Sequence, residues 1–278
     1  MTTTSMNGTA PSQRSLREGV RVLAVEDVTL RFGGITALAG VSFTVAPGTV
    51  HALIGPNGAG KSSCFNVISG LYRPTGGRVR LGDDMLTDLR PHRLAGLGVG
   101  RSFQNIALSP GSTVRDNVML GRHALTSGGF FAGGLRLPRT RRTERRHLAR
   151  VEEICAFLGV ADRLDVPVAA LPYGIAKRVD IARALACEPT VLLLDEPAAG
   201  LDTGETAEMA VTIRELRDAL GISVLLVEHD MGLVMGIADR VTVLDFGRLI
   251  ADGLPAAIQN DPAVIRAYLG AGDEEDQD

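Results

Sequence analysis

The segment from Gly55 to Ser62, Gly-Pro-Asn-Gly-Ala-Gly-Lys-Ser, has the residue types and spacing of a loop that binds phosphate groups. It follows an apolar stretch that ends at Ile54, and a predicted helix starts at Lys61. Glycines let successive backbone N–H groups converge on phosphate oxygens, and the helix N-terminus adds a favourable dipole. Lys61 would reach the terminal phosphates, and the Ser62 hydroxyl would bind Mg²⁺. The predicted nucleotide site comprises Gly55, Pro56, Asn57, Gly58, Ala59, Gly60, Lys61, Ser62 and Ser63.

The lysine content supports this interpretation of Lys61. The chain has 29 basic residues, of which only Lys61 and Lys177 are lysines. Because a solvated positive charge can be carried by either basic side chain, a general preference for arginine explains the surface positions. It does not explain a lysine inside a glycine-rich loop, so a chance glycine turn is the weaker alternative there.

A second segment, Val191-Leu-Leu-Leu-Asp195-Glu196, is an apolar strand that ends in two carboxylates. Open α/β sheets bind ligands at the carboxyl ends of their strands. Asp195 is expected to hold Mg²⁺, directly or through water, and Glu196 to polarise a water molecule for attack on a γ-phosphate. Alone, this pattern is explained equally well by a capped strand end. Next to a phosphate-binding loop, it predicts ATP hydrolysis.

The elements that would position these residues alternate between strands and helices. The first part is rich in β-structure, with predicted strands at 21–30, 41–45 and 49–54 and hairpin-like turns at Gly33-Gly34 and Pro47-Gly48. Helical patterns follow at 114–121, 143–158 and 176–185. Buried strands are predicted at 190–195 and 223–227 around a helix at 204–220, and a strand pair turns at Phe246-Gly247. Continuous apolar strands between helices predict a parallel sheet covered on both faces.

Composition limits the class of protein. The formal net charge of -3 gives no basic excess, so nucleic acid is not an expected partner. The apolar runs fall far short of the length that a membrane helix requires. The start lacks the apolar stretch of a secretory signal, which predicts a protein that stays in the cytosol. Cys64, Cys155 and Cys187 lack metal-ligand spacing and are expected to be reduced structural thiols.

Taken in order, these segments resemble the nucleotide-binding domains of ABC transporters. The segments that carry the resemblance are the phosphate loop, Gln104 in Arg101-Ser-Phe-Gln, Leu171-Pro-Tyr-Gly174, Leu194-Asp-Glu-Pro197, Gly200-Leu-Asp202 and Glu228-His-Asp230. The resemblance implies an α/β fold of P-loop NTPase type, with a RecA-like parallel-sheet core, an antiparallel β subdomain and a helical subdomain. It also implies a flexible tail over 1–20, one nucleotide-binding domain over 21–270 with helical residues 106–178 inserted, and an acidic tail over 271–278.

The resemblance implies roles for several single residues. Gln104 would touch Mg²⁺ and couple the site to a membrane partner, and His229 would contact the γ-phosphate. Asp202 would communicate across a dimer of two cassettes. Phe32 would stack on adenine, for which the π-face of a phenylalanine suffices. Each has an ordinary structural alternative, a polar strand end for Gln104 and His229 and a core side chain for Phe32.

Three details resemble the LivG-type subunits of branched-chain amino-acid importers: Arg31-Phe-Gly-Gly, Arg101-Ser-Phe-Gln-Asn, and Leu-Pro-Tyr-Gly followed by Glu-Pro-Ala-Ala-Gly-Leu. The insert from Arg122 to Arg150 fits too. This implies two permease subunits, an external substrate-binding protein and a location on the cytoplasmic side of the membrane. The alternatives are a cassette of a lipid or lipopolysaccharide exporter and a non-transport ABC ATPase. Only an arginine cluster favours RNA, formed by Arg136, Arg139, Arg141, Arg142, Arg145, Arg146 and Arg150. With Glu144, Glu152 and Glu153 nearby, it is better explained as a solvated helix face that is structural or contacts a membrane partner or anionic lipid.

The signature segment departs from the family pattern Leu-Ser-Gly-Gly-Gln. Here it is Leu171, Pro172, Tyr173, Gly174 and Ile175, so the serine is replaced by proline. In the family that serine hydroxyl donates a hydrogen bond to the γ-phosphate held by the opposite cassette. Proline has neither a side-chain donor nor a backbone N–H. The sequence therefore predicts a heterodimer in which the partner cassette has a conventional signature and the two ATP sites differ.

Overall fold

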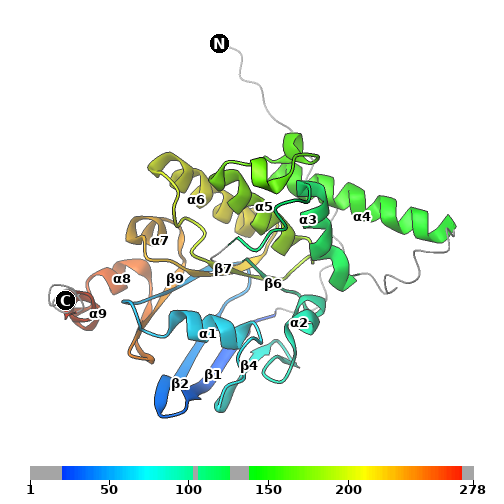
Figure 1. Cartoon of the computed structure of the whole chain (residues 1–278). Coiled ribbons are helices and arrows are strands. Elements are labelled where there is room, and N and C mark those ends of the chain that lie inside the picture. Colours follow the sequence, from blue (N-terminus) through cyan, green and yellow to red (C-terminus); the bar gives the residue numbers. More distant parts are fainter. Residues whose placement is uncertain (1–20, 103–105, 126–137, 271–278) are drawn as a thin grey trace.

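The computed structural model describes residues 21–102, 106–125 and 138–270. Within them, two sheets and a block of helices pack together (Figure 1). The first sheet is antiparallel and has the order β2-β1-β4-β5. Its strands are β1 (Leu23–Phe32), β2 (Ile35–Val45), β4 (Gly76–Leu81) and β5 (Asp84–Met85). The predicted hairpin at Gly33-Gly34 is confirmed, because β1 and β2 pair from Phe32↔Ile35 to Leu23↔Val45.

The second sheet is mostly parallel and has the order β10-β9-β3-β8-β7-β6. Its strands are β3 (Val50–Ile54), β6 (Val99–Arg101), β7 (Val191–Asp195), β8 (Ser223–Val227), β9 (Arg240–Asp245) and β10 (Arg248–Gly253), the last of which is antiparallel. Every residue of β3, β7 and β8 is buried. The prediction of a parallel sheet with both faces covered is therefore confirmed.

The predicted hairpin at Pro47-Gly48 is wrong. The strand that follows it, β3, pairs with β8 and β9 and not with β2. The physical reason is that every residue of β3, His51 included, is buried, so this strand lacks the alternation of buried and exposed residues found in a strand with one solvated face. Pro47-Gly48 therefore carries the chain from the antiparallel sheet into the centre of the other one.

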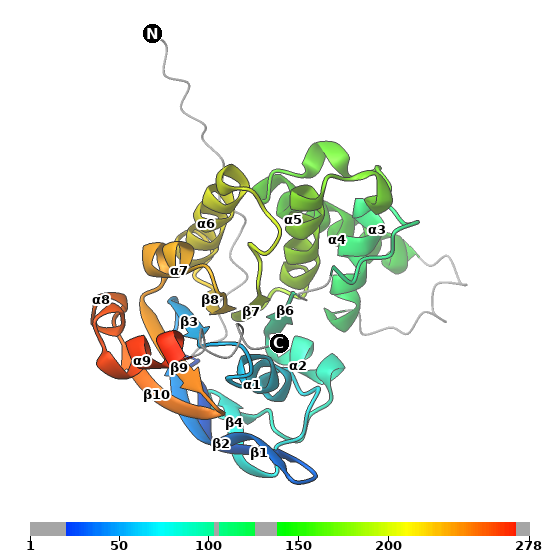
Figure 2. The same ribbon diagram turned by 60° about the vertical axis from the view of Figure 1, so that its left-hand side comes forward.

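The helices cover the second sheet and form a block beside it (Figure 2). They are α1 (Lys61–Ile68), α2 (Pro91–Leu97), α3 (Val114–Gly121), α4 (Pro138–Phe157), α5 (Tyr173–Leu185), α6 (Thr203–Asp218), α7 (Met231–Ile237), α8 (Pro255–Gln259) and α9 (Pro262–Gly270), with 3-10 turns at Arg122–Leu125, Ala161–Arg163 and Val168–Ala170. Helix α4 starts five residues before the predicted boundary, because its first turns are charged and have no apolar periodicity. None of the helices in the described ranges is both long and apolar enough to span a membrane.

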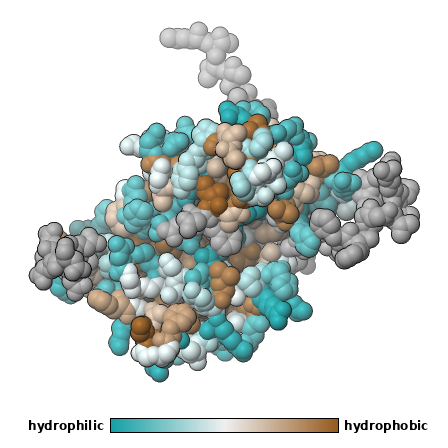
Figure 3. Space-filling model, viewed as in Figure 1, coloured by the Kyte–Doolittle hydropathy of each residue, from teal (hydrophilic) through white to brown (hydrophobic). Residues whose placement is uncertain are grey.

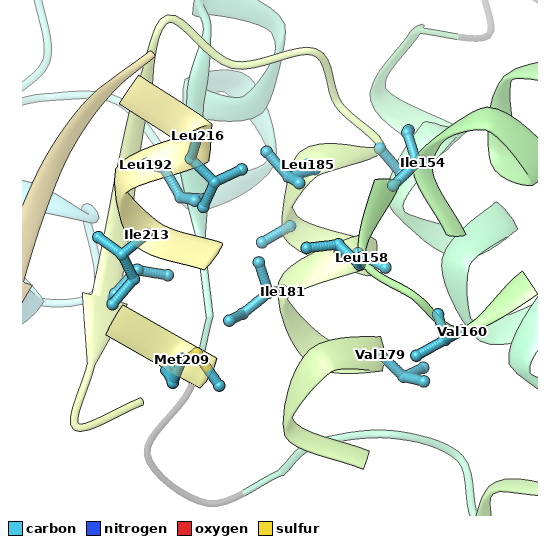
Figure 4. Close-up of a cluster of buried hydrophobic side chains, with 14 of the residues drawn as sticks. Ile154, Leu158, Val160, Val179, Ile181, Leu185, Leu192, Met209, Ile213 and Leu216 are labelled. Carbon is cyan, nitrogen blue, oxygen red and sulfur yellow. The ribbon is translucent and has the colours of Figure 1, made fainter. Parts of the chain in front are cut away.

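One hydrophobic cluster joins the helical block to the sheet. In Figure 4, Ile181 of α5 points toward Ile213 of α6, Leu158 at the end of α4 lies on the other side of α5, and Leu192 of β7 belongs to the same cluster. All four side chains are almost fully buried. At about 25 cal/mol per Å² of apolar surface, such burial is the main stabilising contribution to this junction. The three cysteines are buried and free, as predicted.

A buried arginine fixes the helices relative to each other. Arg122, directly after α3, donates from Nε to Nδ1 of His147 on α4 at 2.7 Å, and from a guanidinium nitrogen to the carbonyl of Ala186 after α5 at 3.1 Å. Burial lowers the pKa of His147, and the Arg122 charge lowers it further. The imidazole is thereby kept neutral, so Nδ1 can accept the hydrogen bond.

Candidate functional site

The phosphate loop lies where the sequence predicts, between the end of β3 and the start of α1. Two of its glycines have backbone geometry that side chains disfavour, with φ of 149° at Gly55 and 100° at Gly60. A Cβ atom would lie 2.1 Å from the carbonyl oxygen of Leu244 at Gly55 and 2.8 Å from that of Ala37 at Gly60. The glycines are therefore required by close packing of neighbouring backbone.

Two neighbouring segments hold the loop. The N–H of Gly247, in the turn between β9 and β10, donates to the carbonyl of Ala59 at 3.0 Å. The carbonyl of Gly247 accepts a hydrogen bond from the N–H of Ala39 on β2 at 2.9 Å. The loop is thus tied to both sheets, and the β1-β2 hairpin is brought against it.

Lys61 bonds to the loop itself. Its ammonium donates to the carbonyl oxygens of Gly55 at 2.6 Å and Pro56 at 2.9 Å. Burial lowers the pKa of Lys61, and the negative charge of Glu196 partly offsets this effect. The influence of Glu196 shows that the structure brings the general-base candidate within electrostatic range of the loop.

Asp195 is the last residue of β7 and is almost fully buried. The Arg101 guanidinium forms an ion pair with its carboxylate at 3.0 Å, and Arg101 also donates to Asn66 on α1 and to Ser69. Burial raises the pKa of Asp195, and the Arg101 charge opposes that rise. In the sequence Arg101 stands out only as part of a motif, and no local pattern predicts this contact.

The backbone of Glu196 is held by hydrogen bonds at both its N–H and its carbonyl. Its φ is 47°, in the left-handed region, and its N–H donates to the carbonyl of Val227 on β8 at 2.9 Å. Its own carbonyl accepts a hydrogen bond from the ammonium of Lys177 at 2.9 Å. Lys177 lies on α5, is only 3% exposed, and faces the ring of Tyr173 at 5.6 Å. Sequence analysis missed this role, although Lys177 was the other of the two lysines.

A buried carboxylate joins the ends of β7 and β8. Glu228 is 1% exposed and accepts hydrogen bonds from the N–H of Ala198 at 2.8 Å and that of His229 at 3.1 Å. The side chain of His229 is 66% exposed, and its Nδ1 lies 3.8 Å from the Glu228 carboxylate. The imidazole is thus accessible while the backbone that carries it is fixed. Its contact with a γ-phosphate stays a prediction.

The signature residues lie at the N-termini of two helices. Pro172 is the exposed N-cap of α5, and Leu171 precedes it. Gly174 is buried, and a Cβ there would lie 2.5 Å from the Glu205 carboxylate on α6. Asp202 caps α6, because its carboxylate accepts from the N–H of Glu205 at 2.8 Å. The structure thus groups the signature segment with Asp202.

The adenine candidate is accessible. Phe32 ends β1, is 47% exposed, and meets Tyr72 edge-on with ring centroids 5.3 Å apart. Its ring is therefore oriented by a second aromatic. The remaining predicted metal contact, Gln104, lies outside the described residues.

Comparison with known proteins agrees with this geometry. The sequence model of the family "ABC transporter" matches residues 38–199, and that of "Branched-chain amino acid ATP-binding cassette transporter" matches 248–274. The chain is 41% identical to the high-affinity branched-chain amino acid transport ATP-binding protein LivG of Escherichia coli K12, over 90% of this chain and 98% of LivG. It is 40% identical, with the same coverage, to BraF of Pseudomonas aeruginosa.

Solved structures give the same result for the fold. An ATP-binding cassette of an ABC transporter, solved in its ADP conformation, superposes with a TM-score of 0.78 at 30% identity, covering 91% of this chain and 100% of that one. The motifs in their sequence order, the two-sheet fold and the relatives agree, and the chain belongs to the ABC transporter family of ATP-binding, ATP-hydrolysing subunits.

Proposed function

We propose that this chain powers an importer of branched-chain amino acids by binding and hydrolysing ATP. The observation that carries the proposal is that the phosphate loop and the clamped Glu196 follow the carboxyl ends of β3 and β7, two parallel strands of one sheet in a cassette fold. The substrate class rests on LivG and BraF, whose names state branched-chain amino acid transport, and on the matching C-terminal residues 248–274. The cassette itself need not touch the transported molecule.

The described residues suit a magnesium–ATP complex. Ser62 is exposed at the start of α1, and the Asp195 carboxylate lies at the end of β7. Hydroxyl and carboxylate oxygens are ligands that Mg²⁺ prefers, and it keeps the remaining positions for phosphate and water. The ion would neutralise charge that develops on the phosphates. Ser62, Asp195 and Gln104 would hold it.

In the proposed reaction, the Lys61 ammonium exchanges the carbonyls of Gly55 and Pro56 for phosphate oxygens. Glu196 orients and deprotonates the attacking water, and its fixed peptide limits where the carboxylate can point. His229 contacts the γ-phosphate, and Phe32 stacks on adenine.

The decisive experiment is the substitution Glu196→Gln. It keeps the hydrogen-bonding shape and removes the charge that activates water, so ATP should bind while turnover collapses. Nucleotide binding is measured by titration calorimetry, and turnover by phosphate release from the assembled transporter. Turnover at the wild-type rate would remove Glu196 from its proposed role.

We also propose that the cassette works as a heterodimer with a conventional partner. Pro172 is exposed at the N-cap of α5 and offers neither a hydroxyl nor an N–H to a phosphate. The partner's ATP, which would meet this segment, loses a charge-assisted contact worth about 1.5–3 kcal/mol. Removing the catalytic carboxylate from one cassette at a time should therefore give unequal losses of turnover. Equal losses, or an active homodimer, would defeat this asymmetry.

A groove on the helical side fits the docking of a permease. It encloses about 260 Å³ and has an apolar lining that includes Leu71 after α1, Leu94 of α2 and Leu120 of α3. Leu120 is 57% exposed, and Figure 3 shows apolar side chains exposed among polar ones on this face. A short amphipathic helix from a permease would bury them. Two permeases and an external binding protein would complete the importer, with this chain peripheral on the cytoplasmic side.

A further inference from the structure

The first half of α4 differs from the second half in its surroundings. Val151, Ile154 and Cys155 are buried in the cluster that joins the helical block to the sheet. By contrast, all five residues at 142–146 are exposed. In Figure 1 this end of α4 extends beyond α3 and α5. A helix segment that is polar on all sides has little intrinsic stability in water. A surface that contacts it would stabilise this end.

The exposed segment carries a concentrated positive charge. Arg142, Arg145 and Arg146 fall within about 100° around the helix axis, since successive residues are about 100° apart. None of the three forms an ion pair with another residue in the described ranges. Arg150, two turns further on, differs, because its charge is matched by Glu153 at 2.7 Å and Glu188 at 3.5 Å. Among the arginines at 142–150 of α4, those without an ion pair thus lie at the projecting end.

The position of this end relates it to a membrane surface. Helices α2 and α3, which line the groove, lie on the same side of the molecule as the projecting end of α4 in Figure 1. If a permease docks in that groove, as proposed above, the face formed by Arg142, Arg145 and Arg146 lies beside the permease. Lipid headgroups surround a permease at the membrane surface, so this face would lie close to them. We propose that Arg142, Arg145 and Arg146 bind anionic phospholipid headgroups next to the permease. The orientation rests on the proposed function, whereas the charge and exposure do not.

The expected strength is small. A basic residue close to an anionic membrane strengthens binding about fivefold, so three give about 100-fold. That is too weak to hold the chain on a membrane by itself, and the isolated chain should be released by washing. Added to a permease contact, the same charges increase the occupancy of the docked state, because the second contact is intramolecular.

The test measures co-flotation of the full chain with vesicles of phosphatidylcholine, with and without phosphatidylglycerol, at low ionic strength. The wild-type chain should bind only the anionic vesicles and should be released by salt. The triple variant R142Q/R145Q/R146Q should bind about 100-fold more weakly. The triple lysine variant should retain binding, since the headgroups require charge. The matched control R214Q/R248Q/R266Q loses the same charge elsewhere and should bind like wild type.

Four outcomes would overturn the proposal. The first is that the wild-type chain does not bind anionic vesicles, and the second is that the glutamine triple variant binds them as tightly as wild type. The third is that the control variant loses as much binding as the glutamine triple variant, and the fourth is that the wild-type chain binds RNA more tightly than vesicles. If the glutamine triple variant fails to assemble with the permease and wild type does not bind vesicles, Arg142, Arg145 and Arg146 contact an acidic protein segment instead. ATP turnover and permease assembly of the wild type are measured in parallel. Their absence would refute the proposed function, whatever the vesicles show.

Discussion

Replacing Lys177 with methionine tests whether a buried amine positions the proposed catalytic carboxylate of Glu196. Methionine keeps much of the apolar stem and removes the ammonium that donates to the Glu196 carbonyl at 2.9 Å. A hydrogen bond from a charged donor contributes about 1.5–3 kcal/mol, partly offset because no charge is then buried. For a domain of this size, a loss of that magnitude lowers Tm by roughly 3–12 °C.

The same substitution should separate kcat from KM. Glu196 holds a left-handed backbone conformation, which is strained for a residue with a side chain. Without Lys177 one of its two clamps is gone, so the carboxylate is less well placed and kcat should fall by roughly 10–100-fold. The KM for ATP should change little, because the Lys61 contacts are untouched.

Thermal unfolding and steady-state phosphate release measure the two effects. The control is Arg178→Met, next along α5, which removes a surface ion pair with Glu208. Exposed pairs contribute little, so this variant should resemble wild type. The positioning role would be refuted if Lys177→Met lowered Tm without changing kcat. It would also be refuted if Lys177→Met and Arg178→Met had the same Tm and the same kcat.

Three further predictions concern binding, pH and docking. Lys61→Ala should weaken ATP binding in a titration, because phosphate charge is left uncompensated; unchanged affinity would contradict this. Burial lowers the pKa of His51 from 6.5 to about 4, so the unfolded chain takes up a proton that the folded chain resists as pH falls. This penalty is absent above pH 6.5 and grows to about 3 kcal/mol near pH 4. Urea unfolding should show that the free energy of unfolding decreases between pH 6.5 and pH 4 in wild type and decreases less in His51→Gln. Equal decreases in the two proteins would exclude His51 as the cause. Leu120→Asp should prevent co-purification with the permeases while ATP binding is retained; normal assembly would exclude the groove.

The strand cores and the phosphate loop were predictable because their signals are local. The apolar runs at β3, β7 and β8 require burial on both faces, and glycine spacing alone locates the loop at Gly55. The error at Pro47-Gly48 has the opposite cause. A turn signal marks where a chain bends but does not specify which strand it joins next.

The contacts around the site could not be predicted in the same way. Lys177 on α5 reaches the carbonyl of Glu196 directly after β7, and Arg101 reaches Asp195 from a position 94 residues away in the chain. Glu228 was visible only as part of a motif, and its bond to the N–H of Ala198 depends on β7 and β8 lying side by side. Such pairs follow from tertiary geometry. The functional roles assigned to the site residues remain predictions.

The scarcity of lysine gives this protein an unusual chemical property. Its two lysine side chains both lie at the candidate site, and Lys177 is almost fully buried there. The Lys61 amine has a lowered pKa, so it loses its proton, and becomes nucleophilic, at a lower pH than an ordinary lysine. Among the side chains of this protein, an amine-selective acylating reagent would therefore modify mainly Lys61, besides the α-amino group of the chain. The rate of labelling read on the peptide that carries Lys61 would report occupancy of the phosphate loop.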